Sequence, residues 1–260
     1  MKIISGKQPQ ARRTLLYGVH GVGKSTWASE APNPIFLNIE DGLNDIECSR
    51  TEQLRDLDSV MESLRWLYGQ KHDFQTAVID TMDWLEALIH QAVALEHNKS
   101  SIGEIPYGKG YELAIAKWDK LFLALDFLRK ERRMHIICLC HCDVVKHTAP
   151  DADSYDRYQP ALHKSSVNTL QEWCDEVLFA NYRVYVRKSD EGFGRQRNVA
   201  MGEGERFIQT QETATALAKN RLKMPAEIDF SWSAYSKYFA GNVAGIVVDG
   251  SSKKKESVNG

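Results

Sequence analysis

The sequence predicts an α/β fold with a mainly parallel central sheet, helices on its faces and an antiparallel extension toward the C-terminus. Two observations predict this class. Short apolar runs of strand length alternate with longer segments whose apolar residues recur at helical spacing, which is typical of a parallel sheet covered by helices. A glycine-rich loop also lies between the first of these strands and the first helix.

The composition is that of an ordinary globular chain. Of its 260 residues, 43% are apolar and 26% are charged, and the net charge is -2. We expect one domain over residues 1–240 and a disordered, serine- and lysine-containing tail over residues 241–260. The near-zero charge excludes a chain that is basic all over, so nucleic acid would be contacted by local patches. No apolar run approaches the ~20 residues of a membrane span, and no signal peptide is recognisable, which predicts a cytoplasmic protein that binds no membrane.

The most specific signal is a phosphate-binding loop that follows the predicted strand Thr14 to Tyr17. Within residues 18–26, the segment from Gly18 to Ser25 matches the pattern G-x-x-x-x-G-K-[ST] without a gap, and a helix can begin at Ser25. Lys24 is expected to reach the β- and γ-phosphates, and Ser25 to ligate Mg²⁺, which predicts ATP and Mg²⁺ as cofactors. The residues expected to bind the nucleotide are Gly18, Val19, His20, Gly21, Val22, Gly23, Lys24, Ser25 and Thr26.

Three further strands lead to polar residues on the phosphate side of the sheet. These strands are predicted at residues 35–39, 76–79 and 136–140. Glu40 follows the first and either polarises the water that attacks the γ-phosphate or belongs to a solvated turn. Asp80 follows the second and is expected to hold the Mg²⁺ shell together with Ser25. His141 is expected just past the third, where it either senses the γ-phosphate or only caps the strand.

Three helices are predicted from apolar stripes at helical spacing. The stripes run from Leu54 to Leu67, from Trp84 to Leu95 and from Ala114 to Leu128.

Cys138, Cys140 and Cys142 alternate along the predicted strand at residues 136–140 and its end. Alternation puts the three sulfur atoms on one face but ~7 Å apart, which is too far for a compact tetrahedral metal site. We therefore predict small buried thiols in a reducing compartment.

Two segments are predicted to be loops that could contact single-stranded DNA. Lys99 to Tyr111 contains glycines and a proline and is expected to be a mobile loop, whereas Asp143 to Ser166 is long, polar and aperiodic. Aromatic and basic side chains on these loops could stack on and pair with unpaired bases. The residues are Tyr107, Lys109, Tyr155, Arg157 and Tyr158. The acidic residues Asp151, Asp153 and Asp156 oppose strong binding, and the alternative for the second segment is a disordered insertion.

An antiparallel meander is predicted after the strand Val177 to Ala180. Its strands are expected at residues 183–186, 198–201 and 206–209, and the segment Lys219-Asn220-Arg221 follows them.

In this order, the phosphate-binding loop, Glu40, Asp80, His141 and residues 219–221 resemble the core of the RecA-like recombinases. Residues 39–43, Ile-Glu-Asp-Gly-Leu, resemble the strand that ends in the catalytic glutamate of that family. Residues 78–81, Val-Ile-Asp-Thr, resemble its Walker B strand. Residues 219–221, Lys-Asn-Arg, resemble the basic segment that reaches the nucleotide of a neighbouring subunit.

A narrower resemblance rests on Tyr107-Gly108-Lys109-Gly110-Tyr111 and Lys219-Asn220-Arg221-Leu222. Both segments are similar to those of compact phage P-loop ATPases that include the Sak-type single-strand annealing proteins. The resemblance spans about Arg12 to Phe239. It departs from RecA at His141, where RecA usually has glutamine, and the assembly helix and C-terminal domain of RecA have no counterpart.

The resemblance implies a phage protein, located in the cytoplasm of its bacterial host, that hydrolyses ATP slowly with Mg²⁺. It implies binding of single-stranded DNA and a role in annealing or homologous recombination, with turnover stimulated by DNA or self-assembly. Implied partners are single-stranded DNA, further copies of the chain in a ring or filament, and a single-strand-binding protein. The implied catalytic residues are Glu40, Lys24, His141, Lys219 and Arg221.

Two alternative functions remain open from the residues themselves. One is a P-loop ATPase that acts on protein partners, such as a helicase loader or an assembly factor. The other is a small-molecule kinase, which ranks last because no arginine-bearing lid over the phosphates is evident.

Overall fold

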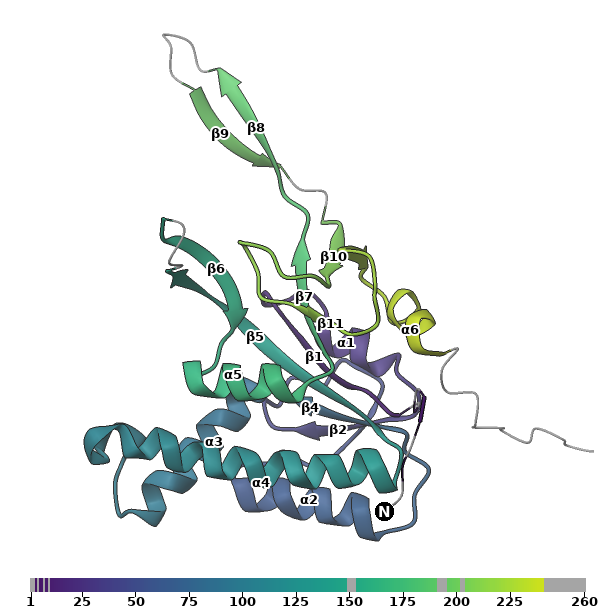
Figure 1. Cartoon of the computed structure of the whole chain (residues 1–260), viewed down its shortest axis with the longest axis vertical. Helices are drawn as coiled ribbons and strands as arrows, with labels where there is room; N and C mark the ends of the chain where they lie inside the picture. Colours follow the sequence, from purple (N-terminus) through teal and green to yellow (C-terminus); the bar gives the residue numbers. More distant parts are fainter. Residues whose placement is uncertain are drawn as a thin grey trace, which may run out of the picture.

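A ten-stranded sheet with helices on both faces forms the centre of the computed structural model (Figure 1). The structure describes residues 3, 5, 6, 8, 10–148, 153–190, 196–201 and 204–240. Six strands of the sheet run parallel, and the strands that join it from the C-terminal part of the chain are antiparallel. The predicted class, a mainly parallel sheet flanked by helices with an antiparallel C-terminal extension, is confirmed.

The order of the parallel strands across the sheet differs from their order in the chain. From one side to the other they are β7 (Glu176–Tyr182), β1 (Arg13–Gly18), β5 (His135–His147), β4 (Thr76–Asp80), β2 (Pro34–Asn38) and β3 (Ser49–Arg50). Because parallel strands all run to the same edge of a sheet, β1, β2 and β4 end close together. Gly18 at the end of β1 lies opposite His141 of β5, and Asp80 at the end of β4 lies opposite Asn38 of β2.

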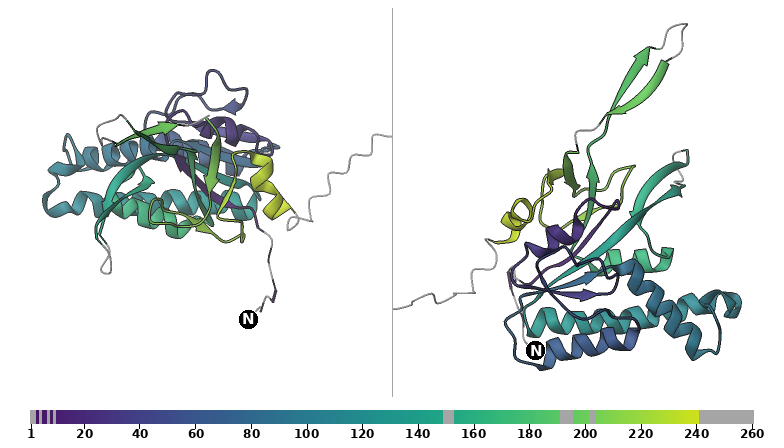
Figure 2. Two further views of the ribbon diagram at one scale, coloured as in Figure 1. Left: turned by 90° about the horizontal axis from the view of Figure 1, so that it is seen from above. Right: turned by 180° about the vertical axis from the view of Figure 1, so that it is seen from behind.

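The antiparallel strands extend the sheet beyond β7 and beside β5. They are β6 (Tyr155–Pro160) on β5, β10 (Arg206–Gln209) and β11 (Lys219–Asn220) on β7, and β12 (Glu227–Asp229) on β10. A separate two-stranded hairpin consists of β8 (Tyr185–Asp190) and β9 (Gln196–Met201). The end of β5 forms a second hairpin with β6. The β5–β6 and β8–β9 hairpins continue from strand ends at the same edge of the sheet, and Figure 2 shows them projecting from the body of the protein.

Helices cover the two faces of the sheet. One face carries α2 (Leu57–Gly69), α3 (Met82–Glu96), α4 (Lys109–Glu131) and α5 (Lys164–Trp173), and the other carries α1 (Lys24–Ser29) and α6 (Trp232–Ala240). Alternation along each strand supplies both cores. In β1, for example, Leu15 and Tyr17 pack toward α2–α5, whereas Leu16 packs toward α1 and α6.

The predicted loop from Asp143 to Ser166 was wrong. β5 continues past His141 to His147 and pairs with β6 in an antiparallel hairpin, and α5 begins at Lys164. His141 therefore lies within a strand rather than just past one. In β5 the residues from Cys142 to His147 are all partly or fully exposed, whereas those from Ile136 to His141 are buried. The projecting part therefore lacks the alternation of buried and exposed residues by which a half-buried strand is recognised from sequence.

The predicted mobile loop from Lys99 to Tyr111 also differs from the structure. It forms two short 3₁₀ turns, Ile102–Glu104 and Pro106–Gly108, and then the first turn of α4. Ile102 and Ile105 are buried, and a Cβ atom at Gly110 would lie 2.6 Å from the Ile102 side chain. These apolar contacts anchor the segment to α3 and α4.

Other expectations have mixed outcomes. The three strands predicted for the meander are present as β8, β9 and β10, but only β8 and β9 pair with each other, and β10 pairs with β7 in the main sheet. Cys138 and Cys140 are buried, and all five cysteines are free thiols. Trp84 and Leu95 of the predicted α3 stripe are exposed. The tail at 241–260 and Asp151 lie outside the described residues. Among the helices of the described ranges, none has the length and apolar character to cross a membrane.

Candidate nucleotide-binding site

The phosphate-binding loop joins β1 to α1 and has the curved backbone that its glycines permit. Gly21 and Gly23 have φ values of +72° and +97°, in the left-handed region that favours glycine. A Cβ atom at Gly18 would lie 2.2 Å from the carbonyl oxygen of Ala180, so only glycine fits beside β7. The loop sequence is thus matched to a conformation in which backbone N–H groups can surround phosphate oxygens.

Two residues that the sequence did not single out hold this loop from outside. The Tyr182 hydroxyl donates to the Gly21 carbonyl at 2.9 Å, and Arg206 Nη1 donates to the Val22 carbonyl at 3.0 Å. The Arg206 guanidinium also lies over the Phe230 ring at 4.9 Å. These contacts come from β7 and β10, more than 150 residues along the chain, and no local pattern signals them.

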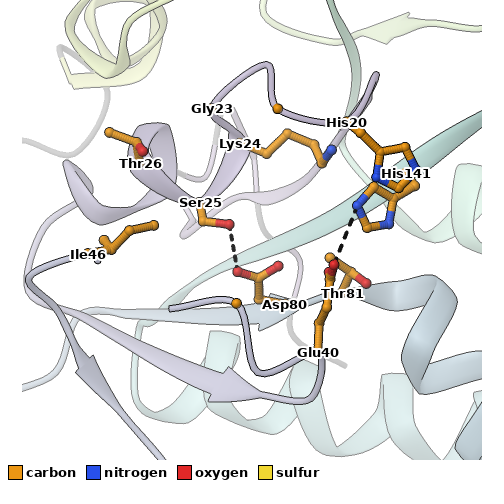
Figure 3. A pocket seen from close by; sticks show the side chains of 12 residues that line it. His20, Gly23, Lys24, Ser25, Thr26, Glu40, Ile46, Asp80, Thr81 and His141 are labelled. Atoms are coloured by element: carbon orange, nitrogen blue, oxygen red, sulfur yellow. Dashed lines mark hydrogen bonds and ion pairs between the residues drawn. The ribbon is translucent and has the colours of Figure 1, made fainter. Parts of the chain in front are cut away.

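Lys24 is buried at the start of α1, and its side chain turns back along the loop (Figure 3). Nζ donates to the carbonyl oxygens of Gly18 and Val19 at 3.1 and 3.2 Å. Burial lowers the pKa of Lys24, while the surrounding acidic groups, Asp83 and Glu40 among them, oppose that shift. A cation held by loop carbonyls is placed to exchange them for phosphate oxygens.

Ser25 and Asp80 face each other across the pocket. Ser25 Oγ donates to Asp80 Oδ2 at 2.7 Å. Burial raises the pKa of Asp80 to about 6, against the hydrogen bond from Ser25, and the Glu40 carboxylate adds to the rise. Within the described residues this hydroxyl is the only side-chain donor that reaches the buried carboxylate. A hydroxyl and a buried carboxylate are oxygen ligands suited to Mg²⁺, so the residues present fit this ion.

Glu40 and His141 form a second polar group in the pocket, and Asp83 holds His141 from beside it. The Glu40 backbone N–H donates to the Asp80 carbonyl at 3.1 Å, and Glu40 Oε1 lies 3.7 Å from His141 Nε2. His141 donates to Asp83 through its backbone N–H at 3.1 Å and through Nδ1 at 2.8 Å. The His20 ring stacks on His141 with centroids 3.9 Å apart. Asp83 was missed from the sequence, although its place three residues after Asp80, in the first turn of α3, is a usable signal.

One pocket brings these groups together (Figure 3). Its lining residues are His20, Gly21, Gly23, Lys24, Ser25, Thr26, Glu40, Gly42, Ile46, Asp80, Thr81 and His141. Gly18, Val19 and Val22 of the loop are not among them, and the Val22 side chain is fully buried in the core on the α1 side.

Lys219 and Arg221 lie away from this pocket. β11 pairs with the first residues of β7, at the edge of the sheet opposite to the phosphate-binding loop. Lys219 Nζ donates to the carbonyls of Gln171, Glu172 and Cys174, at the C-terminal end of α5, at 2.7, 3.1 and 2.7 Å. Arg221 pairs with Asp175 at 2.9 Å, and half of its side chain is exposed. Within one chain these cations stabilise the end of α5 and its neighbourhood.

Some of the five residues predicted to contact DNA have exposed or partly exposed side chains. Tyr107 is 96% exposed, and the neighbouring Lys109 is exposed too. Tyr155 lies near the end of the β5–β6 hairpin, partly exposed beside His147.

Arg157 and Tyr158 differ from the expectation of exposed side chains. Arg157 is buried and pairs with Glu212 at 2.6 Å, and the Tyr158 ring stacks on Phe179 with centroids 4.9 Å apart. The backbone of Tyr158 also bonds to residues 215 and 217, because the base of the hairpin packs against that segment.

The fold and the pocket define a nucleoside-triphosphate-binding protein of the P-loop class. A family profile described as an AAA domain matches residues 10–222, and the chain belongs to that family. Among solved structures, the chain is similar to one described as "Crystal structure of the RadB recombinase", with 12% sequence identity over 87% of this chain and 90% of that chain and a TM-score of 0.46. A search of curated proteins gave no match.

Proposed function

We propose that this protein is a Mg²⁺-dependent, RecA-like ATPase that binds single-stranded DNA and promotes annealing or homologous recombination. The ATPase part rests on the pocket in which Lys24, the Ser25–Asp80 pair and the Glu40–His141 pair converge. Lys24 would bind the β- and γ-phosphates, and Ser25 and Asp80 would hold Mg²⁺, which neutralises phosphate charge. Glu40 would polarise the attacking water, and His141 would respond to the γ-phosphate.

The DNA part of the proposal rests on the length of β5. This single strand contains His141 in the pocket and continues to His147 in the hairpin that carries Tyr155. A nucleotide that repositions His141 can therefore bias the hairpin, because both belong to one hydrogen-bonded strand. Exposed Tyr107 and Lys109, at the start of α4, would add a stacking face and a cation for unpaired bases.

Self-association belongs to the same proposal. Residues 1–240 would form the ATPase core, and copies in a ring or filament would place Arg221 and Lys219 beside a neighbour's γ-phosphate. The side chain of Arg221 is half exposed, which leaves it able to exchange Asp175 for another anion. A single-strand-binding protein is proposed as a further partner, and the cytoplasm of a phage-infected bacterium as the location.

A P-loop ATPase that acts on a protein partner is the second candidate. It is favoured by an exposed apolar patch that Tyr68 of α2 forms with Leu123 and Phe127 of α4. The Tyr68 and Phe127 rings are 5.9 Å apart, and Leu123 and Phe127 share a helix face at i,i+4 spacing. Such a patch is suited to a protein surface rather than to a polyanion.

One experiment separates the two functions. ATP turnover with Mg²⁺ is measured with and without single-stranded DNA, for the wild type and for Lys24→Ala. Stimulation by DNA in the wild type alone supports the first proposal. Turnover that ignores DNA, with DNA binding absent in an anisotropy titration, would leave the protein-partner ATPase. A folded wild type that neither binds nor hydrolyses ATP would contradict both.

A further inference from the structure

His141 is held by one carboxylate through two hydrogen bonds. Asp83 Oδ1 accepts from the His141 backbone N–H at 3.1 Å, and Oδ2 accepts from Nδ1 at 2.8 Å. Both oxygens of Asp83 therefore accept from one residue, and the buried Cys140 thiol is a further neighbour of this carboxylate. Asp83 lies in the first turn of α3, whereas His141 lies in β5, so this contact joins the helix after β4 to the neighbouring strand.

The two hydrogen bonds determine which ring nitrogen carries a proton. An ionised carboxylate only accepts hydrogen bonds, so Nδ1 must be the donor. Burial alone would raise the pKa of Asp83, but the hydrogen bonds from His141 outweigh it and lower that pKa to about 2, which keeps the carboxylate ionised. A neutral imidazole has one N–H group, so its Nε2 is left with a free lone pair.

The orientation of the ring is restricted from a second direction. His20 stacks on its face, with the two rings within 17° of parallel. With its Nδ1 edge on Asp83 and one face on His20, the ring presents Nε2 to Glu40 Oε1 at 3.7 Å. This distance is longer than a direct hydrogen bond, and a small movement of the Glu40 side chain would close it.

We infer that Asp83 is a positioning residue, which holds His141 in the tautomer whose Nε2 accepts a hydrogen bond and faces Glu40. The inference rests on the proposed ATPase function for its catalytic meaning. In that site an accepting Nε2 would orient Glu40, once protonated, or a water molecule beside it. With the opposite tautomer, Nε2 would donate to Glu40 and make its carboxylate a weaker acceptor of the water proton.

Asp83→Asn tests this inference with little change in shape. An amide has one accepting oxygen and one donating nitrogen. The best arrangement keeps the oxygen on the His141 backbone N–H and points the NH₂ group at Nδ1, which moves the ring proton to Nε2. We expect kcat to fall about 10- to 100-fold, by analogy with the loss of a carboxylate that orients a metal-binding histidine. KM for ATP should stay within about twofold, because the variant leaves Lys24 and Ser25 in place.

The control is Asp58→Asn. Asp58 is the acidic residue in the first turn of α2, as Asp83 is in α3, but it is exposed, whereas Asp83 is hydrogen-bonded to His141 in the pocket lining. Both variants lose one carboxylate at a helix N-terminus, so a loss of helix stability alone would affect them alike. A fall in kcat for Asp58→Asn equal to that for Asp83→Asn would overturn the positioning role.

A second measurement reads the tautomer without any turnover. Nitrogen NMR of the ¹⁵N-histidine-labelled protein at alkaline pH, assigned with His141→Gln, should show a protonated Nδ1 in the wild type and a protonated Nε2 in Asp83→Asn. An Nε2–H tautomer in the wild type would overturn the inference even if Asp83→Asn failed to fold. If the wild type hydrolyses no ATP, the proposed function fails, while this spectrum still decides whether Asp83 sets the tautomer.

Discussion

Glu40 and Asp80 are joined through their backbones, because the Glu40 N–H donates to the Asp80 carbonyl oxygen at 3.1 Å. The N–H of Ile39 donates to the same oxygen at 3.0 Å. The two carboxylates proposed for water activation and for Mg²⁺ are therefore fixed to neighbouring strand ends. Their roles can be separated by substitution, because the side chains point to different partners, His141 and Ser25.

Glu40→Gln should leave nucleotide binding intact and slow hydrolysis by about 10²- to 10⁴-fold, the usual contribution of a general base. The amide keeps the size of the side chain but cannot take a proton from water. ATP affinity and kcat are measured separately, with Glu47→Gln as control, since Glu47 lies on the same connection, exposed and outside the pocket. Turnover of Glu40→Gln at the wild-type rate would contradict this role and show that Glu40 is only a residue of a solvated turn.

Part of this site could be predicted from local sequence patterns together with the geometry of a parallel sheet. Gly18–Thr26, Glu40 and Asp80 each follow an apolar strand, and parallel strands end at one edge, so their proximity is a consequence of the fold class. Asp83 bonds to a residue 58 positions away and Tyr182 to one 161 positions away. Such long-range contacts leave no periodic signal in a single sequence.

Arg221→Ala tests whether the site is completed by a neighbouring subunit. If Arg221 acts on a neighbour's nucleotide, the variant should bind ATP but hydrolyse it slowly, because a cation that stabilises developing charge is lost. Mixing it with Lys24→Ala, itself inactive, should restore part of the turnover, since each subunit supplies what the other lacks. Lys219→Ala is a less selective variant, because the Lys219 amine also caps α5.

No recovery on mixing, together with turnover per subunit that is independent of protein concentration, would contradict completion in trans. In that case the Arg221–Asp175 pair at 2.9 Å describes the whole role of this side chain.

His135 should make the stability of the fold depend on pH. Its Nδ1 accepts from the Arg12 backbone N–H at 3.0 Å, and burial, with the Arg12 charge, lowers the pKa of the ring from 6.5 to about 4. The unfolded chain binds this proton more readily, so the stabilisation is complete above about pH 6.5 and is lost as the pH falls toward 4. The free energy of unfolding should fall by at most about 1.4 kcal/mol per pH unit from this group.

His135→Asn keeps an accepting oxygen but removes the titration. Urea unfolding at several pH values should give a shallower slope for this variant than for the wild type. Equal slopes for the wild type and His135→Asn would show that other groups cause the acid sensitivity.

Single-stranded DNA affinity should depend on Tyr107 and Tyr155 but not on Tyr68. Removing an aromatic ring that stacks on a base costs ~1–3 kcal/mol, which corresponds to about a 5- to 150-fold loss of affinity. Tyr107→Ala and Tyr155→Ala should each weaken binding in an anisotropy titration, and added salt should weaken it further because Lys109 contributes charge. Tyr68→Ala removes an exposed ring from α2 and is the matched control. Tyr158→Ala should instead lower the unfolding free energy, because its ring packs on Phe179.

If ATP shifts the hairpin through His141, the affinity of the wild type for single-stranded DNA should rise with ATP, and the affinity of Lys24→Ala should not. Equal and negligible DNA binding by all these proteins, with and without ATP, would remove the annealing function and leave the apolar patch at Tyr68, Leu123 and Phe127 as the surface to test for a protein partner.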